Sequence, residues 1–234
     1  MTIHDTFAGA QYTARIANLA NDMGMKLQVG DDFEEYADLV RSYRPEQPLG
    51  EPFDPEKQRI SRQNGFWVTG WNARGEMVHT QAIRRLRLGG TLADYLSAHF
   101  RQFPPSGVAL DKSRSVYTPG PGAQRITGIT CYHGEAWLKG GNAGFRGTGI
   151  AGILARFAMT SAVLRWSPDF IFCFVPEGLA YRGLIEREGY MHAEPGALCW
   201  RLQDGGQLRG FMGWMGRDDL THLMKISPEV LLAA

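Results

Sequence analysis

The feature that most constrains this chain is a glycine-rich segment at residues 140–152, which holds six of the 29 glycines. Residues 125–138, before it, are rich in β-prone side chains and predict a strand. After it, the apolar residues Ile150, Ile153 and Phe157 recur at helical spacing. The sequence therefore predicts a strand, a glycine-rich turn and a helix in direct succession.

An unbroken apolar run, residues 170–175, follows this helix and predicts a central strand that is covered on both faces. A strand, a helix and a second strand in this order form a parallel pair with a right-handed crossover. Where the helix begins, near Thr148, the first backbone N–H groups have no partner within the helix, and the helix dipole favours an anion. The glycines leave this turn open and Arg146 adds a positive charge, so the turn predicts a diphosphate-binding site.

Three residues of the turn, Arg146, Gly149 and Ala151, fill the pattern Gln/Arg-x-x-Gly-x-Gly/Ala. Together with the flanking elements, this pattern resembles the signature of the GCN5-related N-acetyltransferase (GNAT) superfamily. Residues 134–138 look like the fourth strand of that family, and residues 187–190 look like its late Gly-aromatic turn.

The resemblance implies an α/β fold with a central, mostly antiparallel mixed sheet, one parallel strand–helix–strand pair and flanking helices. It implies acetyl-CoA or CoA as the acyl-donor ligand, and acyl transfer by direct attack of an amine on the thioester. The strand edge would bind the pantetheine arm and the turn would bind the diphosphate. The residues expected to bind the donor are Trp137, Leu138, Lys139, Arg146, Gly147, Thr148, Gly149, Ile150, Ala151 and Gly152.

Two residues are candidate catalytic groups. Glu135 lies on the strand and would take the amine proton directly or through water; the alternative interpretation is a solvated carboxylate. The family often has a tyrosine four residues before the late glycine as the general acid, but this chain has Ile185 there. Tyr181, one helical turn earlier, is the candidate substitute, and the alternative is that it packs on a helix face.

Two other functions remain open. Without the expected acid, the protein would be a CoA- or ligand-binding module that has no turnover. Alternatively, Gly147-x-Gly149-x-x-Gly152 spells the dinucleotide fingerprint of an NAD-binding oxidoreductase. Such a site needs a strand that runs into the first glycine and an acid after the next strand; Glu177 supplies the acid, but the apolar strand stops at Leu138.

Charge and cysteine content argue against several classes of protein. The 25 basic and 24 acidic residues give a net charge of +1, so neither a nucleic-acid nor a membrane partner is expected. Three cysteines without paired spacing or a histidine cluster favour neither a metal site nor a disulfide framework. Because no secretory signal or uninterrupted apolar span is visible, a cytoplasmic location is expected. The expected partner is a small-molecule or peptide amine acceptor, and a homodimer is allowed.

The length fits a single domain. We divide it into an N-terminal helix at 1–24, an acceptor-side half at 25–125, an acyl-CoA-binding half at 126–202 and a C-terminal extension at 203–234. The finer elements expected are a hairpin over 66–86, a loop at 113–123, one helix over 178–188 and a last strand at 198–202.

Overall fold

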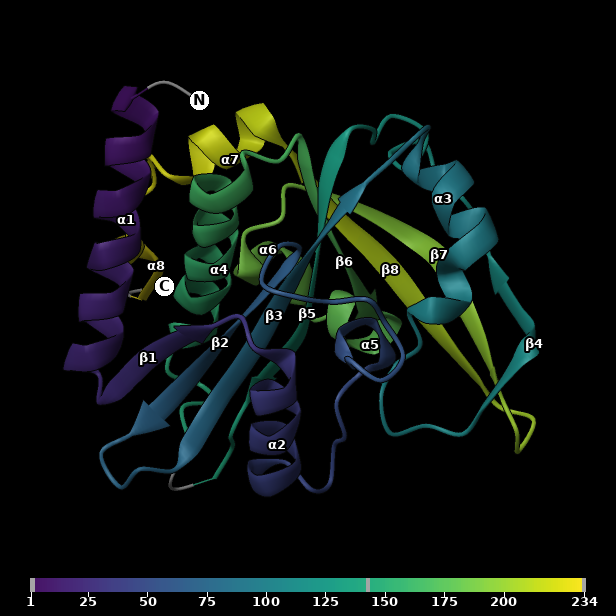
Figure 1. The fold of residues 1–234 in the computed structure, drawn as a ribbon, viewed down its shortest axis with the longest axis horizontal. Helices are drawn as coiled ribbons and strands as arrows, with labels where there is room; N and C mark the ends of the chain where they lie inside the picture. The colour runs from purple at the N-terminus through teal and green to yellow at the C-terminus, as the bar shows by residue number, and fades with distance from the viewer. Residues whose placement is uncertain (1–2, 142–143, 233–234) are drawn as a thin grey trace.

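The computed structural model describes residues 3–141 and 144–232, and it is built on one eight-stranded sheet (Figure 1). The strands lie side by side in the order β1-β2-β3-β5-β6-β8-β7-β4. Every neighbouring pair in this sheet is antiparallel except β5 and β6. The predicted fold class, a mixed sheet with one parallel pair, is therefore confirmed. The strands are β1 (Met25–Gly30), β2 (Gly65–Asn72), β3 (Met77–Arg87), β4 (Leu110–Tyr117), β5 (Ile129–Leu138), β6 (Phe170–Pro176), β7 (His192–Leu202) and β8 (Gln207–Gly216).

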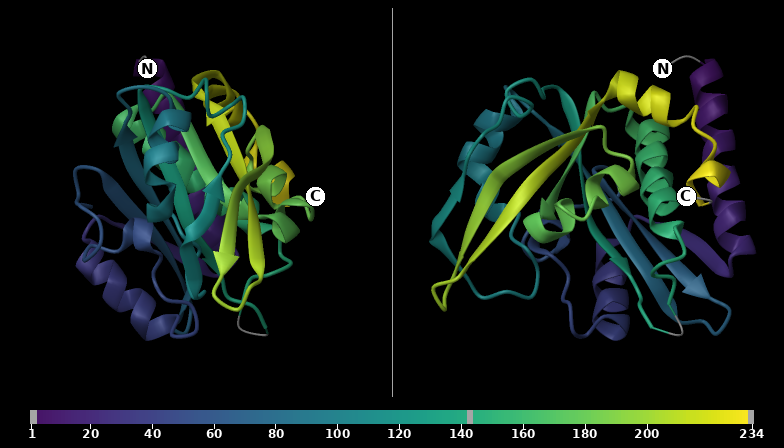
Figure 2. Two further views of the ribbon diagram at one scale, coloured as in Figure 1. Left: turned by 90° about the vertical axis from the view of Figure 1, so that its right-hand side faces the viewer. Right: turned by 180° about the vertical axis from the view of Figure 1, so that it is seen from behind.

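Helices cover both faces of the sheet and bury a separate core on each (Figures 1 and 2). On one face α1 and α4 bury aliphatic side chains such as Ile16 and Ile153, and on the other α2, η1 and α3 bury aromatic ones such as Tyr36 and Phe53. Among the described residues, no helix is long and apolar enough to span a bilayer. The helices are α1 (Ile3–Asp22), α2 (Phe33–Tyr43), α3 (Leu92–His99), α4 (Ile150–Trp166), α5 (Glu177–Ala180), α6 (Leu184–Glu188), α7 (Arg217–Leu223) and α8 (Pro228–Leu232), with 3₁₀ turns η1 (Glu51–Phe53) and η2 (Phe100–Gln102).

The predicted strand–helix–strand unit is β5, α4 and β6. Helix α4 is buried along most of its length, as its small and apolar residues require. The parallel ladder contains only three residue pairs, from Thr130 with Phe170 to Tyr132 with Phe172. Beyond Tyr132 the two strands are no longer paired, and this separation positions the site described below.

The structure differs from the sequence-based expectations at three elements. Residues 113–123 were expected to form a loop, but residues 110–117 form the edge strand β4. The polar side chains of this strand suit an edge that faces solvent. Residues 178–188 form two short helices, α5 and α6, because Gly183 has a φ of 74°. Strand β8 was not expected at all; its glycines lower its strand propensity, yet it lies inside the sheet between β6 and β7.

Candidate active site

The separation of β5 from β6 leaves a cavity of about 320 Å³. The backbones of both strands form its walls where the ladder has ended, and α5, α6 and the loops around η1 and η2 complete the enclosure. From β5, β6 and α6, the lining residues include Gly134, Glu135, Ala136, Cys173, Phe174, Leu184 and Glu188. Two carboxylates therefore lie on the lining, one from β5 and one from α6.

A β-bulge gives Glu135 its position. The register between β3 and β5 shifts between Thr80 and Ala82, and Glu135 has a φ of 57°, which non-glycine residues adopt at an energetic cost. The hydroxyl of Thr80 donates to the carbonyl of Glu135 at 3.0 Å. A bulge held in this way points the Glu135 side chain toward the α2–η1 segment rather than into the ladder.

Glu135 is not the solvated carboxylate of the alternative interpretation, because its side chain is only 7% exposed. One oxygen accepts from the backbone N–H of Gly50 at 2.9 Å, and the other lies 3.1 Å from the fully buried guanidinium of Arg44. Burial raises the pKa of Glu135, and Arg44 opposes part of that rise. Glu135 is thus a buried, ion-paired carboxyl at the wall of the cavity.

Glu188, at the end of α6, is the second carboxyl of the cavity and was not singled out in the sequence. It is 7% exposed and has no hydrogen-bond or ion-pair partner among the described residues. Burial raises its pKa to about 7, although Arg187 and Arg156 lower it. The signal available in the sequence was a Glu directly before Gly189, in a turn that was noted only for its glycine and aromatic residue.

The end of β5 is fixed to β3 on one side. The carbonyl of Trp137 accepts from His79 at 2.8 Å, and the N–H of Lys139 donates to Val78 at 2.8 Å. On the other side, β5 is paired with β6 only as far as Tyr132. Beyond Tyr132, the side of β5 that faces β6 is therefore not paired with another strand, and this is the side where an extended ligand was expected to bind.

The turn before α4 is open to solvent. Residues 146–149 are exposed, and the N-cap residue Gly149 has a φ of 79° and no side chain with which to cap the helix. The hydroxyl of Thr148 accepts a long hydrogen bond, 3.4 Å, from the N–H of Ile150. The Nε group of Arg146 donates to the carbonyl of Leu138 at 2.7 Å, which holds this cation beside the end of β5. A helix start and a positive charge thus meet at one exposed corner, as the predicted diphosphate site requires, although two of its N–H groups, those of Ile150 and Gly152, already have acceptors and the corner lies outside the lining of the cavity.

Two helices, α6 and α8, pack against the start of α4. A Cβ on Gly152 would lie 2.7 Å from the carbonyl oxygen of Arg187, so this glycine allows α6 to approach α4 closely. A Cβ on Gly149 would lie 3.6 Å from the carbonyl oxygen of Leu232, because α8 lies beside α1 and α4 (Figure 2). The end of α8 is therefore in van der Waals range of the helix start without covering it.

The structure does not supply the geometry of a dinucleotide site. Strand β5 ends at Leu138, so it does not run into Gly147, and the sheet around it is antiparallel except for one pair. A doubly wound site needs the strand to lead directly into the glycine turn. The spacing Gly147-x-Gly149-x-x-Gly152 is therefore no evidence for an NAD-binding oxidoreductase in this chain.

Tyr181, the candidate proton donor, lies at the end of α5. Its side chain is 74% exposed, and its ring stands edge-on to Phe211 with centroids 5.1 Å apart. The cavity is lined by its neighbours Leu179 and Leu184, and Tyr181 is not among the lining residues. Ile185, at the position of the family's acid, is buried and belongs to the core on the α4 face.

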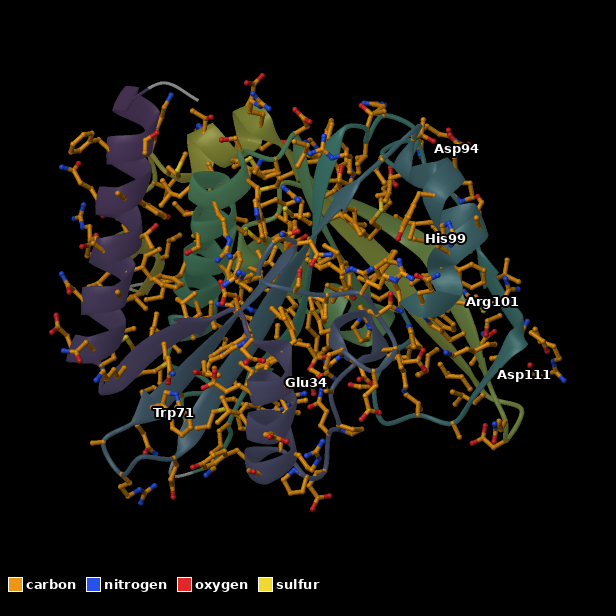
Figure 3. The ribbon with its side chains drawn as sticks, in the orientation of Figure 1. Glu34, Trp71, Asp94, His99, Arg101 and Asp111 are labelled. Atoms are coloured by element: carbon orange, nitrogen blue, oxygen red, sulfur yellow. The ribbon has the colours of Figure 1, made fainter. Side chains whose placement is uncertain are left out.

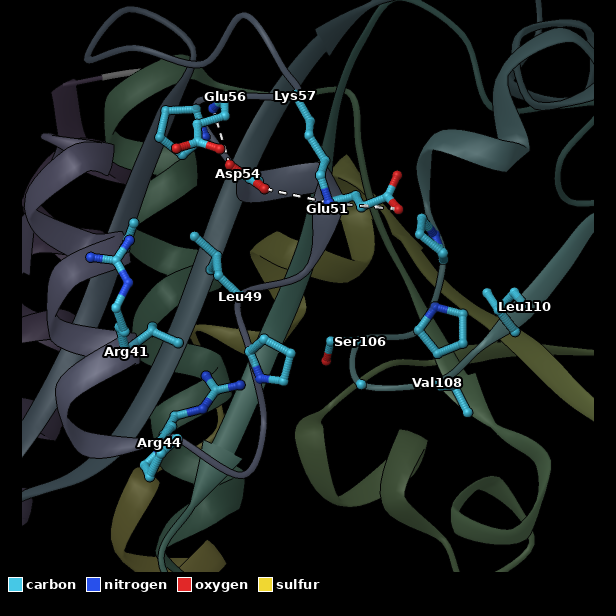
Figure 4. A pocket seen from close by; sticks show the side chains of 18 of the residues that line it. Arg41, Arg44, Leu49, Glu51, Asp54, Glu56, Lys57, Ser106, Val108 and Leu110 are labelled. Atoms are coloured by element: carbon cyan, nitrogen blue, oxygen red, sulfur yellow. Dashed lines mark hydrogen bonds and ion pairs between the residues drawn. The ribbon is translucent and has the colours of Figure 1, made fainter. Parts of the chain in front are cut away.

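A larger cavity of about 640 Å³ adjoins the first, and the two share Pro104, Pro105 and Ser106 (Figure 4). It lies between α2, the segment around η1 and the loop that leads into β4. In Figure 3 the label Glu34 locates α2, and the label Asp111 locates the start of β4, just after this loop. Arg44 lines this larger cavity while its partner Glu135 lines the smaller one, so their ion pair lies at the boundary between the two.

The larger cavity carries charges of both signs. Lys112 is 2.7 Å from Glu51, and Lys57 lies within 4 Å of both Glu51 and Asp54 (Figure 4). Among the described residues, Glu34 and Glu56 line the cavity and have no ion-pair partner. The formal charge of the lining is balanced, because Arg41 and Arg44 also line it and pair with Asp38 and Glu135 outside it. Glu34 and Glu56 are therefore the two carboxylates of the lining that a cationic group could approach without breaking an ion pair.

A buried network ties the late turn to β5 and α4. Tyr190 and His133 are joined by a hydrogen bond of 2.9 Å, His133 and Gln81 by one of 3.0 Å, and Gln81 donates to the carbonyl of Leu154 at 2.6 Å. Burial lowers the pKa of His133 to about 4, so its ring is neutral near pH 7. These bonds fix the turn that carries Glu188 against the strand that carries Glu135.

No protein-family model and no curated protein matches the chain. Similar solved structures include Arabidopsis thaliana NAA60 in complex with acetyl-CoA, which is 13% identical with a TM-score of 0.48 over 83% of this chain and 99% of that one. They also include mutant forms of the spermidine/spermine N-acetyltransferase SpeG from Vibrio cholerae, 9% identical with a TM-score of 0.46 over 86% and 98% of the two chains. TofI in an apo form is 14% identical with a TM-score of 0.42 over 88% and 99%. Both SpeG and a similar structure from Staphylococcus aureus Mu50 are described as N-acetyltransferases, and another is described as a putative phosphinothricin N-acetyltransferase.

Proposed function

We propose that this protein is an acyl-CoA-dependent N-acyltransferase, with acetyl-CoA as the acyl donor. One observation carries the proposal: β5 and β6 separate after three residue pairs and leave a carboxylate-lined cavity, and the turn before the following helix is exposed. A cavity bordered by an unpaired strand suits an extended ligand, and a helix N-terminus suits a diphosphate.

The donor would use both features. Its pantetheine arm would follow β5 at Trp137, Leu138 and Lys139, and its acyl end would reach the cavity. To bind the Leu138 carbonyl, the arm would have to displace the Arg146 side chain that now donates to it. Its diphosphate would lie on the turn, with Arg146 as the nearest cation and Gly152 behind it. The remaining residues assigned to this turn are Gly147, Thr148, Gly149, Ile150 and Ala151.

The acceptor would enter from the larger cavity. Glu34 and Glu56 lack cationic partners there, so a protonated amine, free or on a peptide, is the acceptor class that the charge favours. Glu135 lies between the two cavities and is the candidate base that takes the amine proton. Tyr181 and Glu188 are the two candidates for the group that protonates the leaving thiolate.

This proposal treats residues 1–234 as one domain that acts in the cytoplasm. Residues 25–125 contribute the acceptor cavity, and residues 126–202 contribute the donor site. Strand β8, in the segment 203–234, completes the sheet beside β6. No nucleic-acid or membrane partner is part of the proposal, and neither a single chain nor a homodimer is required by it.

Isothermal titration of the purified protein with acetyl-CoA and with CoA tests the proposal. We expect saturable binding of both ligands and competition between them. NAD serves as the matched control, because it carries a diphosphate and an adenosine but no pantetheine arm. Absence of heat with acetyl-CoA and CoA at millimolar concentration would exclude the proposed function.

A second candidate is a CoA-binding module without turnover, and the observation that favours it is Ile185, buried at the position of the family's acid. Release of CoA thiol from acetyl-CoA in the presence of an amine panel separates the two candidates. Steady thiol release with any amine excludes the inert module, and CoA binding without release supports it.

A further inference from the structure

Two carboxyl groups, those of Glu135 and Glu188, line the cavity between β5 and β6, and their surroundings differ. Glu135 is held by the Arg44 guanidinium and the Gly50 N–H, whereas among the described residues the Glu188 carboxyl makes no ion pair and no hydrogen bond, and Arg156 and Arg187 act on it only from farther away. Two carboxyls in one site whose surroundings differ in this way are suited to opposite proton-transfer roles.

We propose that Glu188 is the catalytic acid that protonates the thiolate of CoA as it leaves. This inference rests on the proposed N-acyltransferase function and assigns the proton donor that the sequence could not supply. Its geometric basis is that Glu188 is buried, lines the cavity on the α6 side, and lies across it from Glu135 on β5.

The backbone around Glu188 is rigidly held, so its side chain has a defined place. Arg156 on α4 donates to the carbonyls of Gly152 and Arg187, at 2.8 and 2.9 Å. Gly189, directly after Glu188, ends α6 with a φ of 98°. The hydrogen bond between Tyr190 and His133 then fixes the following residue to β5.

Burial favours the neutral form of Glu188, and the two cations near it, Arg156 and Arg187, oppose this only in part. From α4 and α6, Arg156 and Arg187 act on it only at a distance, and on β6 it faces the neutral thiol of Cys173. From the late turn it faces the neutral phenol of Tyr190, and His133 on β5 is uncharged near pH 7. A carboxyl whose pKa is raised to about 7 is held partly protonated near neutral pH, and it can donate to a thiolate, which is the stronger base.

The transfer step balances with this assignment. The amine nitrogen bonds to the thioester carbonyl carbon and gives its proton to Glu135. The carbon–sulfur bond breaks, and its electron pair goes to sulfur, which takes the proton of Glu188. CoA leaves as a neutral thiol, and proton exchange with solvent returns both carboxyls to their starting states.

The test uses release of CoA thiol from acetyl-CoA by the full chain, with hydroxylamine as the nucleophile. Hydroxylamine is small and largely uncharged near neutral pH, so the reaction does not depend on the unidentified acceptor or on a base. We expect Glu188→Gln to lower the turnover number by about 100-fold with the KM for acetyl-CoA unchanged. Glu186→Gln, on the exposed side of the same helix, is the matched control and should change turnover by less than about twofold.

The pH profile gives a readout that a purely structural role would not affect. The wild-type turnover number should fall as the pH rises through about 7, and Glu188→Gln should lack this decrease. Glu188→Gln that binds acetyl-CoA normally and turns over at the wild-type rate would overturn the assignment. Failure of the wild-type protein to bind acetyl-CoA would instead overturn the proposed function, and this inference with it; the binding titration therefore distinguishes the two failures.

Discussion

The two cavities of this protein differ in how they are built. The smaller one lies between two strands of the β5–α4–β6 unit, and α5, α6 and the segments around η1 and η2 complete its walls. The larger one is assembled from α2, the proline-rich segment around η1 and the loop before β4, which are distant in sequence, and paired charges line it. Under the proposed function, the smaller cavity would receive the acyl group of the donor, and the larger cavity would receive the acceptor.

The ion pair between Arg44 and Glu135 joins the cavities, and breaking it should have the largest effect on stability. Arg44→Ala leaves the Glu135 carboxyl buried without its cation, and we expect a loss of roughly 3–5 kcal/mol in the free energy of unfolding. Chemical denaturation at pH 7 measures it. Arg41→Ala, which removes an exposed ion pair from the same helix, is the control and should cost less than about 1 kcal/mol.

If Arg44→Ala cost no more than Arg41→Ala, the two cavities would not be coupled through a buried charge pair. A double variant, Arg44→Met with Glu135→Leu, sharpens the comparison. It removes both charges, so it should recover most of the lost stability. It should also abolish acyl transfer, since Glu135 is the candidate base.

The next largest effect concerns the donor side alone. Gly149→Asp places a negative charge at the exposed start of α4, where the diphosphate is proposed to bind, and we expect acetyl-CoA affinity to fall by at least about 100-fold. Gly205→Asp is the matched control, because Gly205 also has a positive φ but lies in the β7–β8 turn. Equal affinities of the two variants in a titration would contradict the donor assignment.

A smaller effect on stability is expected from the titration of Glu188. The pKa of Glu188 is raised from 4.5 to about 7 in the folded chain, so the folded state holds this proton more tightly than the unfolded state. The stability contributed by the protonated carboxyl is present below pH 4.5 and is lost as the pH rises through 7, by roughly 3 kcal/mol. Glu188→Gln should remove the part of this dependence that Glu188 contributes and leave that of Glu135, whose pKa is also raised. Denaturation from pH 4 to 8 measures the difference, and an unchanged pH dependence would refute the raised pKa of Glu188.

The smallest effect is expected at Tyr181, which is exposed and outside the lining of the cavity. With Glu188 as the acid, Tyr181→Phe should change the rate of thiol release by less than about threefold. A loss of 100-fold, similar to that expected for Glu188→Gln, would return the role of proton donor to the tyrosine.

The donor half of the fold could be predicted from the sequence because its signals are local. The apolar run of β6, the small residues of α4 and the glycine turn between β5 and α4 each mark one element by its own composition. Strand β8 could not be predicted in the same way. Its glycines weaken the strand pattern, and only pairing with β6 and β7 on both sides stabilises it.

The candidate site was predicted in part for the same reason. Glu135 was singled out because it lies within a recognisable strand, but its partner Arg44 is 91 positions earlier, and no local pattern predicts that contact. Glu188 was missed because burial, rather than its neighbours in sequence, gives it a raised pKa. The acceptor cavity has no motif, since its walls come from separate loops.

The most direct test of the proposed donor site is a titration of the ¹⁵N-labelled protein with CoA, followed by the backbone amide resonances. The account predicts that the largest shifts occur at two places, the amides of residues 147–152 and those of residues 134–138. Shifts confined to other elements, such as the turn between β7 and β8, would contradict it.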